Sequence, residues 1–315
     1  MSLIEAKGNV VLKGLLTFIG SIAILITPVT TQAVAKQSLT WAGCGISKKA
    51  FMTEMAKAYE KKTGIKIELQ GGGATKGIRK VAAREIDLGG ACRQTLEDPN
   101  TLSSHTLERR VQMDPVAWDA LAVIVHKGNP VGNITLDQLR KVYTGRITNW
   151  SQLGGNNAPI ELYVRKGKIS GVGRTSRELI FYDYDQEFSS PRLHVEKSTG
   201  PIEKAIEKDA VNGIAISGIS SAKRRKVKLL KLEGHEPSYE NIKNGSYLLY
   251  RPLFLVTHLR SLDNPEILKF SQFVHSEDGK QIMRNVGTVP YEDAIHLWLK
   301  YLGSVRKAQD AGLRQ

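Results

Sequence analysis

Three short glycine-containing segments of this chain each follow a strand-like run and open a stretch with helical periodicity. They are Gly43–Ser47, Gly71–Gly77 and Ser170–Thr175. The first N–H groups of a helix have no intrahelical partner and lie at the positive end of the helix dipole, so each segment is a candidate anion site. Glycine lets a ligand approach the backbone, and Ser and Thr add neutral hydrogen-bond donors. Three such segments predict a chain that surrounds a small anion.

The order of the predicted elements indicates an α/β fold. The first five are a strand, a helix, a strand, a helix and a strand at Leu39–Ala42, Ser47–Lys62, Ile65–Leu69, Thr75–Arg84 and Ile86–Gly89. Ser47 is a candidate N-cap of the first helix, and Gly64 stands where a helix-ending glycine belongs. This alternation favours a parallel sheet with helices on its faces.

Two long apolar runs, Val116–His126 and Tyr247–Thr257, enclose a second alternating unit. Its predicted elements are a helix near Leu136–Tyr143, a strand near Ile160–Val164, a helix after Ser170, a helix near Ile202–Lys208 and a strand at Ile214–Ile216. Two more helices follow at Pro265–His275 and Glu277–Asn285. We therefore expect two α/β lobes, with the long runs as strands that cross between them.

The N-terminus has the layout of a secretory signal peptide. Lys7 and Lys13 precede an apolar run from Gly14 to Ile26, and the small residues 33–35 supply a cleavage point. The run is short for a membrane span, although an uncleaved anchor is the alternative. We expect a mature protein that starts near Lys36 and is exported, to the periplasm of a Gram-negative cell. The net charge of +14 favours acidic partners, whether a small oxyanion, nucleic acid or an anionic membrane.

Several other functions are not supported by the motifs. The Gly72–Gly77 segment resembles a P-loop but has Ile78 where that motif requires Lys, and Ser176 interrupts a dinucleotide fingerprint after Gly171. The basic run Lys223–Lys226 is better explained as a solvated face than as a nucleic-acid site. The two cysteines match no zinc spacing, and no catalytic His pattern is present. We expect no metal, no cofactor and no nucleic acid, and an enzyme that uses Cys92 as a thiol nucleophile is the alternative from another class.

Two arginines stand where a ligand would lie. Arg165 ends the strand before the Ser170 turn, and Arg93 follows the strand at Ile86. Strand ends and helix starts share an edge in a parallel α/β lobe, and ligands bind at that edge. A guanidinium can hold an oxyanion through two charge-assisted hydrogen bonds.

Several stretches of the chain resemble the periplasmic phosphate-binding proteins of phosphate ABC transporters, which have a two-lobed type II periplasmic-binding-protein fold. The matching stretches are Lys62–Ile67, Gln70–Gly73, Glu85–Gly89, Pro115–Val125, Thr135–Leu139, Tyr143–Trp150 and Gly213–Ile216. The similarity extends from about Leu39 to Asn285, and the Tyr143–Trp150 stretch is its most distinctive part. The resemblance implies two lobes, each a mixed sheet flanked by helices, that are joined by two crossing strands and close on the ligand.

The resemblance also implies a ligand shell. Its members in this chain would be Cys44, Gly45, Ser47, Gly73, Ala74, Thr75, Arg93, Arg165, Ser170, Gly171 and Val172. This chain departs from the family at Ala74 and Val172, where hydroxyl residues are usual, and by one extra residue between Arg165 and Ser170. It also has Arg93 near the position of an acidic residue. A carboxylate accepts a proton from a protonated oxyanion, so its replacement predicts weaker discrimination among tetrahedral oxyanions.

Cys44 and Cys92 fall in the first and third of these loops, which leave neighbouring strand ends of one lobe. We expect them to be close enough to form a disulfide, with two separate buried thiols as the alternative.

These inferences predict a signal peptide at 1–35, lobe I at 36–118 and 252–300, lobe II at 119–251 and a polar tail at 301–315. The predicted protein is a monomeric, exported solute-binding protein that captures phosphate or a related oxyanion and delivers it to an ABC permease. A different small anionic ligand, or a sensory role without transport, is the alternative.

Overall fold

The computed structural model describes residues 38–98, 103–208, 210–261 and 264–312. The predicted signal peptide lies outside these residues. Strands and helices alternate from the start, as the sequence predicts: β1 (Ser38–Gly43), α1 (Gly45–Ser47), α2 (Thr53–Thr63), β2 (Lys66–Gly71), α3 (Ala74–Ala82) and β3 (Leu88–Ala91). β1 pairs in parallel with both β2 and β3. Because parallel strands end at one edge of a sheet, the loops that begin at Cys44, Gly72 and Cys92 meet there.

Two long strands complete this part of the sheet. They are β4 (Val111–His126) and β11 (Tyr250–His258). β11 pairs antiparallel with β3 on one side and with residues 111–120 of β4 on the other. Every residue of β11 is buried, as is the run from Val116 to Val125 in β4. Strands covered on both faces read as continuous apolar runs, which explains why the sequence shows no alternation here.

The rest of β4 belongs to a second set of strands. The elements of this part are β5 (Asn133–Ile134), α4 (Leu136–Tyr143), β6 (Glu161–Arg165), α5 (Gly171–Ser176), β7 (Leu193–Glu196), α6 (Thr199–Lys208), β8 (Gly213–Gly218), α7 (Ile219–Ala222), β9 (Val227–Leu229), β10 (Lys231–Leu232) and α8 (Tyr239–Lys243). β4 pairs antiparallel with β8 from Leu121 onward. β8 and β7 both pair in parallel with β6, so the loops after these parallel strands also open at one edge.

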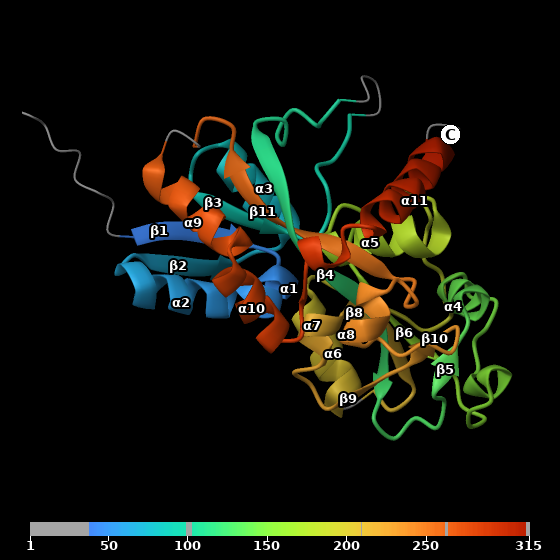
Figure 1. The fold of residues 1–315 in the computed structure, drawn as a ribbon. Coiled ribbons are helices and arrows are strands. Elements are labelled where there is room, and N and C mark those ends of the chain that lie inside the picture. The colour runs from blue at the N-terminus through green and yellow to red at the C-terminus, as the bar shows by residue number, and fades with distance from the viewer. Residues whose placement is uncertain (1–37, 99–102, 209, 262–263, 313–315) are drawn as a thin grey trace, which may run out of the picture. The chain divides into compact units, whose positions relative to one another are not determined.

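The whole sheet has the strand order β2-β1-β3-β11-β4-β8-β6-β7. We call the strands on the β11 side of β4, with their helices, the first lobe, and those on the β8 side the second lobe. Figure 1 shows β4 as the long strand that runs from one into the other. The fold is the predicted mixed α/β class. Of the two strands predicted to cross between the lobes, β4 does so, whereas β11 pairs, among the described strands, only with β3 and with β4. The predicted lobe limits at 118/119 and 251/252 stay a prediction.

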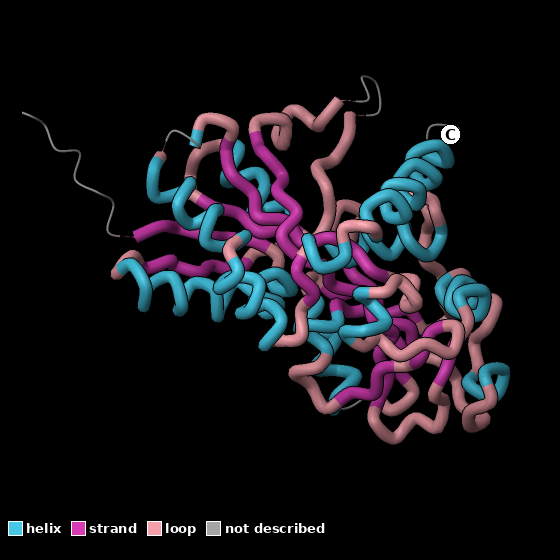
Figure 2. The backbone as a smooth tube through the Cα atoms, viewed as in Figure 1, coloured by secondary structure: helices cyan, strands magenta, loops and turns pink. Residues whose placement is uncertain are grey.

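The C-terminal elements are α9 (Pro265–His275), α10 (Glu277–Asn285), β12 (Val289–Pro290) and α11 (Leu297–Gly312). α9 and α10 pack with α2 on the first lobe, where the Tyr59 ring meets Phe270 and Phe273. Figure 2 shows the strands in the middle and the helices outside them.

Residues 301–312 correct the prediction of a polar tail from Tyr301 onward. They continue α11, in which Tyr301, Val305 and Ala308 are buried. The helix packs against the π-helical turn Arg177–Phe181 of the second lobe. Its apolar residues are widely spaced among charged ones, so composition alone suggests a tail although one face is covered.

The predicted helix over Ser47–Lys62 and its cap also need correction. The helix begins at Gly45, passes through a π-helical turn at Lys48–Met52 and ends at Thr63. Ser47 lies inside it, and its buried hydroxyl donates to the Ala91 carbonyl, so it is not the N-cap. Gly64 does end the helix, with a left-handed φ of 76°. The predicted strand at Ile86–Gly89 lies two residues further on, as β3.

No helix in the part of the chain that the structure describes combines the length and the apolarity needed to span a bilayer.

Candidate functional site: a basic cleft between the lobes

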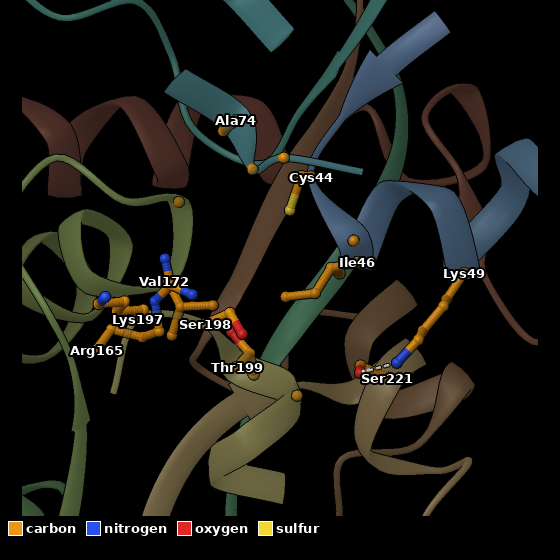
Figure 3. Close-up of a pocket in the computed structure, with 15 residues that line it drawn as sticks. Cys44, Ile46, Lys49, Ala74, Arg165, Val172, Lys197, Ser198, Thr199 and Ser221 are labelled. Carbon is orange, nitrogen blue, oxygen red and sulfur yellow. Dashed lines mark hydrogen bonds between the residues drawn. The ribbon is translucent and has the colours of Figure 1, made fainter. Parts of the chain in front are cut away.

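A cavity of about 290 Å³ lies between the loop edges of the two lobes, and we call it the cleft. Both lobes contribute to its lining, which consists of Cys44, Gly45, Ile46, Lys49, Gly72, Gly73, Ala74, Arg165, Gly171, Val172, Lys197, Ser198, Thr199, Gly200 and Ser221. Figure 3 shows Arg165 and Lys197 at one side of it, Lys49 and Ser221 at the other, and Ile46 between them.

Arg165 is a half-buried cation in the cleft whose charge is not balanced by a nearby acidic group among the described residues. It ends β6. Its guanidinium makes no hydrogen bond or ion pair with any residue that the structure describes, and its Nε atom is buried without a partner. Burial accordingly lowers the pKa of Arg165. A buried charge is costly unless it is paired, so an anion bound in the cleft would stabilise this guanidinium.

The start of α5 stands beside Arg165. Ser170 caps this helix by accepting a hydrogen bond from the Gly173 N–H, while Gly171 and Val172 line the cleft. The first N–H groups of a helix have no intrahelical acceptor, so these residues present backbone donors. Gly171 also packs directly on the first lobe, because a Cβ added there would overlap Cys92 Sγ. The side chain of Val172 contributes no donor.

A fourth strand–turn–helix segment, which the sequence analysis missed, completes this wall. Lys197 and Ser198 follow β7, and Thr199 and Gly200 open α6. All four line the cleft, and the Lys197 amine makes no hydrogen bond or ion pair with the described residues. The signal was present in the sequence, since a basic residue, two hydroxyl residues and a glycine follow a short strand. The preceding strand is not recognisable because β7 lies at the edge of the sheet and its two apolar residues, Leu193 and Val195, are exposed.

Lys49 reaches the cleft from the first lobe but is already engaged. Its amine donates to Ser221 Oγ at 2.7 Å and lies 3.8 Å from Glu203 Oε2. Burial lowers the pKa of Lys49, against the opposing attraction of Glu203. This lysine therefore bridges the two lobes at one side of the cleft.

The rest of the first-lobe wall is formed by small and apolar groups. Cys44 precedes α1 and is bonded to Cys92, with their Cα atoms 6.3 Å apart. Ile46 packs against Gly218 of the second lobe, and Gly73 and Ala74 open α3. Both cysteines of the chain are thus in one disulfide, and the structure offers no thiol nucleophile.

Four of the predicted ligand residues do not line the cleft. Ser47, Thr75, Arg93 and Ser170 are absent from its lining. The Ser170 hydroxyl caps α5, and the Thr75 hydroxyl donates to the Ile169 carbonyl.

Arg93 is the most important correction. Its fully buried guanidinium makes two hydrogen bonds of 2.9 Å with the fully buried Glu108 carboxylate. Its Nε atom donates to the Ile169 carbonyl. Its position at a strand end suggests a ligand contact, but Glu108, fifteen residues further along the chain, pairs with its charge.

A buried ion pair lies where the two lobes join. Asp119 and Arg251 are opposite each other in the pairing of β4 with β11, with 3.4 Å between Arg251 Nη2 and Asp119 Oδ2. Ser220 donates to Asp119 through its N–H and its hydroxyl. Burial raises the pKa of Asp119 and lowers that of Arg251. Arg251 Nη1 also approaches the carbonyls of Cys92 and Gly171, so this pair links the two walls.

These contacts define what the cleft can do. It presents a guanidinium, an amine, hydroxyls and helix-start N–H groups, and none of the described residues that line it is acidic. The described residues also contain no group of His, Cys, Asp and Glu side chains that could hold a metal ion. Such a site binds an anion through hydrogen bonds and charge.

Comparisons with known proteins agree with this geometry. Residues 30–278 match the model of the PBP superfamily domain. The chain is 26% identical over 263 residues to the phosphate-binding protein PstS of Bacillus subtilis, which covers 82% of each protein.

Solved structures show the same similarity. A protein from Clostridium perfringens, described as a phosphate ABC transporter substrate-binding protein and solved with bound phosphate, is 28% identical with a TM-score of 0.71. An ABC-type phosphate transport receptor from Vibrio cholerae is 26% identical with a TM-score of 0.60. In each case the match covers 80% of this chain and 99% of the other.

Proposed function

Because the chain belongs to the PBP superfamily, we propose that it is an exported solute-binding protein that captures phosphate or a related tetrahedral oxyanion in the cleft. The observation that carries the proposal is the half-buried guanidinium of Arg165, which has no partner among the described residues and faces the cleft. An oxyanion would satisfy it and accept hydrogen bonds from the N–H groups at the start of α5.

Delivery to an ABC permease, export by the N-terminal segment and a monomeric state are further parts of the proposal. The names of the relatives support delivery, since both solved proteins are described as components of phosphate transport. The layout of residues 7–35 supports export. A thiol-dependent enzyme is not favoured, because both sulfurs are bonded and the family is one of substrate-binding transport proteins.

The lining of the cleft bears on selectivity. Discrimination for a protonated oxyanion requires a group that accepts its proton, and a carboxylate does this best. The described lining residues include no carboxylate. We therefore expect affinities for phosphate and for fully deprotonated tetrahedral anions to differ by less than about tenfold.

Calorimetric titration of the protein without its first 35 residues tests the proposal. Phosphate, sulfate, molybdate and methylphosphonate should be compared at one ionic strength, with chloride as the control. We expect phosphate to bind at one site. The proposed function is wrong if no oxyanion binds more tightly than chloride. A strong preference for phosphate alone would contradict the expected selectivity and leave the function intact.

A further inference from the structure

Two hydrogen bonds join the lobes at one carbonyl group. Ile169 lies in the second lobe, in the turn between β6 and α5. Its carbonyl oxygen accepts a hydrogen bond from Thr75 Oγ1 at 3.0 Å and another from Arg93 Nε at 2.9 Å. Both donors belong to the first lobe, at the start of α3 and after β3. A carbonyl oxygen has two lone pairs, so these two bonds occupy its full accepting capacity.

Arg93 is held rigidly for this contact. Glu108 Oε1 and Oε2 accept hydrogen bonds from its two terminal nitrogens, and the Gln94 carbonyl accepts a further bond from Nη1. Glu108 also accepts from the Leu96 N–H and from Arg79. Burial acts to raise the pKa of Glu108, but the bonds and charges of Arg93, Leu96 and Arg79 outweigh it, and the pKa is lowered. The carboxylate is therefore ionised and keeps the guanidinium oriented.

Thr75 is connected to the same group. Its hydroxyl accepts a hydrogen bond from Arg93 Nη2 at 2.9 Å and donates one to the Ile169 carbonyl. The guanidinium thus has three kinds of acceptor: the Glu108 carboxylate, first-lobe oxygens and one carbonyl of the opposite lobe. Hydrogen bonds in such a chain polarise one another and form as a unit.

A second contact supports the first. Thr175 Oγ1 of α5 donates to the Cys92 carbonyl at 3.2 Å, next to Arg93 in sequence. The disulfide ties Cys92 to the loop at Cys44, so the first-lobe partner of these contacts is braced. Breaking the lobe contact would move the Ser170 turn away from a fixed first lobe and open the cleft.

We propose that Thr75, Arg93, Glu108 and the Ile169 carbonyl form a latch that holds the two lobes together and slows escape of the bound anion. Arg93 and Thr75 are then positioning residues that act through the Ser170 turn and do not contact the ligand. The affinity part of this inference rests on the proposed function. The latch lies beside the cleft and stabilises the arrangement in which Arg165 and the start of α5 face the first lobe.

The test compares variants that remove bonds of the latch. Thr75→Val is close to isosteric and removes the hydroxyl bonds to Ile169 and Arg93 without leaving an unpaired buried charge, because Arg93 keeps its bonds to Glu108. Arg93→Lys keeps a charge beside Glu108, but a single ammonium lacks the guanidinium fork that reaches both Glu108 and Ile169. For inorganic phosphate we expect affinity to fall about fivefold to tenfold in each, almost entirely through faster dissociation in stopped-flow measurements.

Two matched controls separate the latch from general destabilisation. Thr75→Ser keeps the hydroxyl and should restore wild-type dissociation. Thr53→Val removes a threonine hydroxyl that bonds the Lys48 carbonyl within the first lobe, and it should leave dissociation unchanged. The latch is wrong if Thr75→Val dissociates within twofold of wild type, or if Thr75→Ser is as fast as Thr75→Val.

Small-angle scattering of the ligand-free protein keeps this proposal separate from the proposed function. We expect a larger radius of gyration for Thr75→Val than for wild type or Thr53→Val. If no anion binds to wild type, the proposed function fails and scattering alone decides: a larger radius in Thr75→Val supports the latch, and equal radii overturn it.

Discussion

The two walls of the cleft are built from the same kind of segment but differ in their charge. In the first lobe, the loops after β1, β2 and β3 contribute a disulfide, glycines, Ile46 and Ala74. The one first-lobe cation in the lining, Lys49, is engaged by Ser221 and Glu203. In the second lobe, neither Arg165 nor Lys197 makes a hydrogen bond or an ion pair with another described residue.

This difference suggests that the first wall supports the site and that the second wall binds the anion. The first wall is cross-linked, and its one lining cation is already paired with second-lobe residues, so it acts as a fixed surface. The second wall carries uncompensated charge and free helix-start N–H groups, so it gains most from an anion. The comparison predicts that changes in the first wall lower stability and that changes in the second wall lower affinity.

Removal of the disulfide should have the largest effect. The bond closes a loop between residues 48 positions apart, and its loss increases the conformational freedom of the unfolded chain. We expect the Cys44→Ser, Cys92→Ser double variant to lose about 4 kcal/mol of unfolding free energy. Urea unfolding of the variant, and of wild type with and without reductant, measures this. An unchanged urea midpoint would mean that the disulfide does not stabilise the first wall, and the proposed difference between the two walls would be wrong.

Replacement of Arg165 should lower the affinity for phosphate much more than the stability of the protein. Arg165→Met removes a charged donor from the cleft but no hydrogen bond or ion pair with a described residue, so we expect phosphate affinity to fall about 100-fold with little loss of stability. Arg192→Met is the matched control, because Arg192 is an exposed arginine of the same lobe, before β7. Calorimetry gives the phosphate affinity of both variants, and urea unfolding gives their unfolding free energies. Equal affinities for these variants would mean that Arg165 does not hold the anion.

The two lysines of the cleft should differ by a smaller amount. Lys197 is exposed and makes no hydrogen bond or ion pair with a described residue, and Lys197→Met should weaken phosphate binding about threefold at low salt. Lys49→Met should weaken it less than about twofold, since its amine is already engaged with Ser221 and Glu203. Titrations at two salt concentrations measure both effects, and the Lys197 effect should shrink as salt rises. A larger effect for Lys49 would reverse the assignment of the two walls.

Much of the fold could be predicted from the sequence because periodicity and glycine positions are local signals. The β-α-β-α-β order of the first lobe, the strand that crosses at Val116–His126 and the helix end at Gly64 all follow from neighbouring residues. Helix α11 could not be predicted, since its one covered face depends on the second-lobe surface at Arg177–Phe181. The wall at Lys197–Gly200 has a recognisable pattern, but it follows an edge strand whose apolar residues are exposed and so give no clear strand signal.

The sequence by itself determined which segments reach the ligand edge, because strand ends and helix starts are marked by local residue types. It placed Arg93 and Arg165 at that edge on equal terms. Only the tertiary structure decided between them: Glu108 neutralises Arg93, while the Arg165 guanidinium has no hydrogen bond or ion pair with the described residues. The physical reason is that charge pairing depends on distance in space, which chain neighbours do not specify.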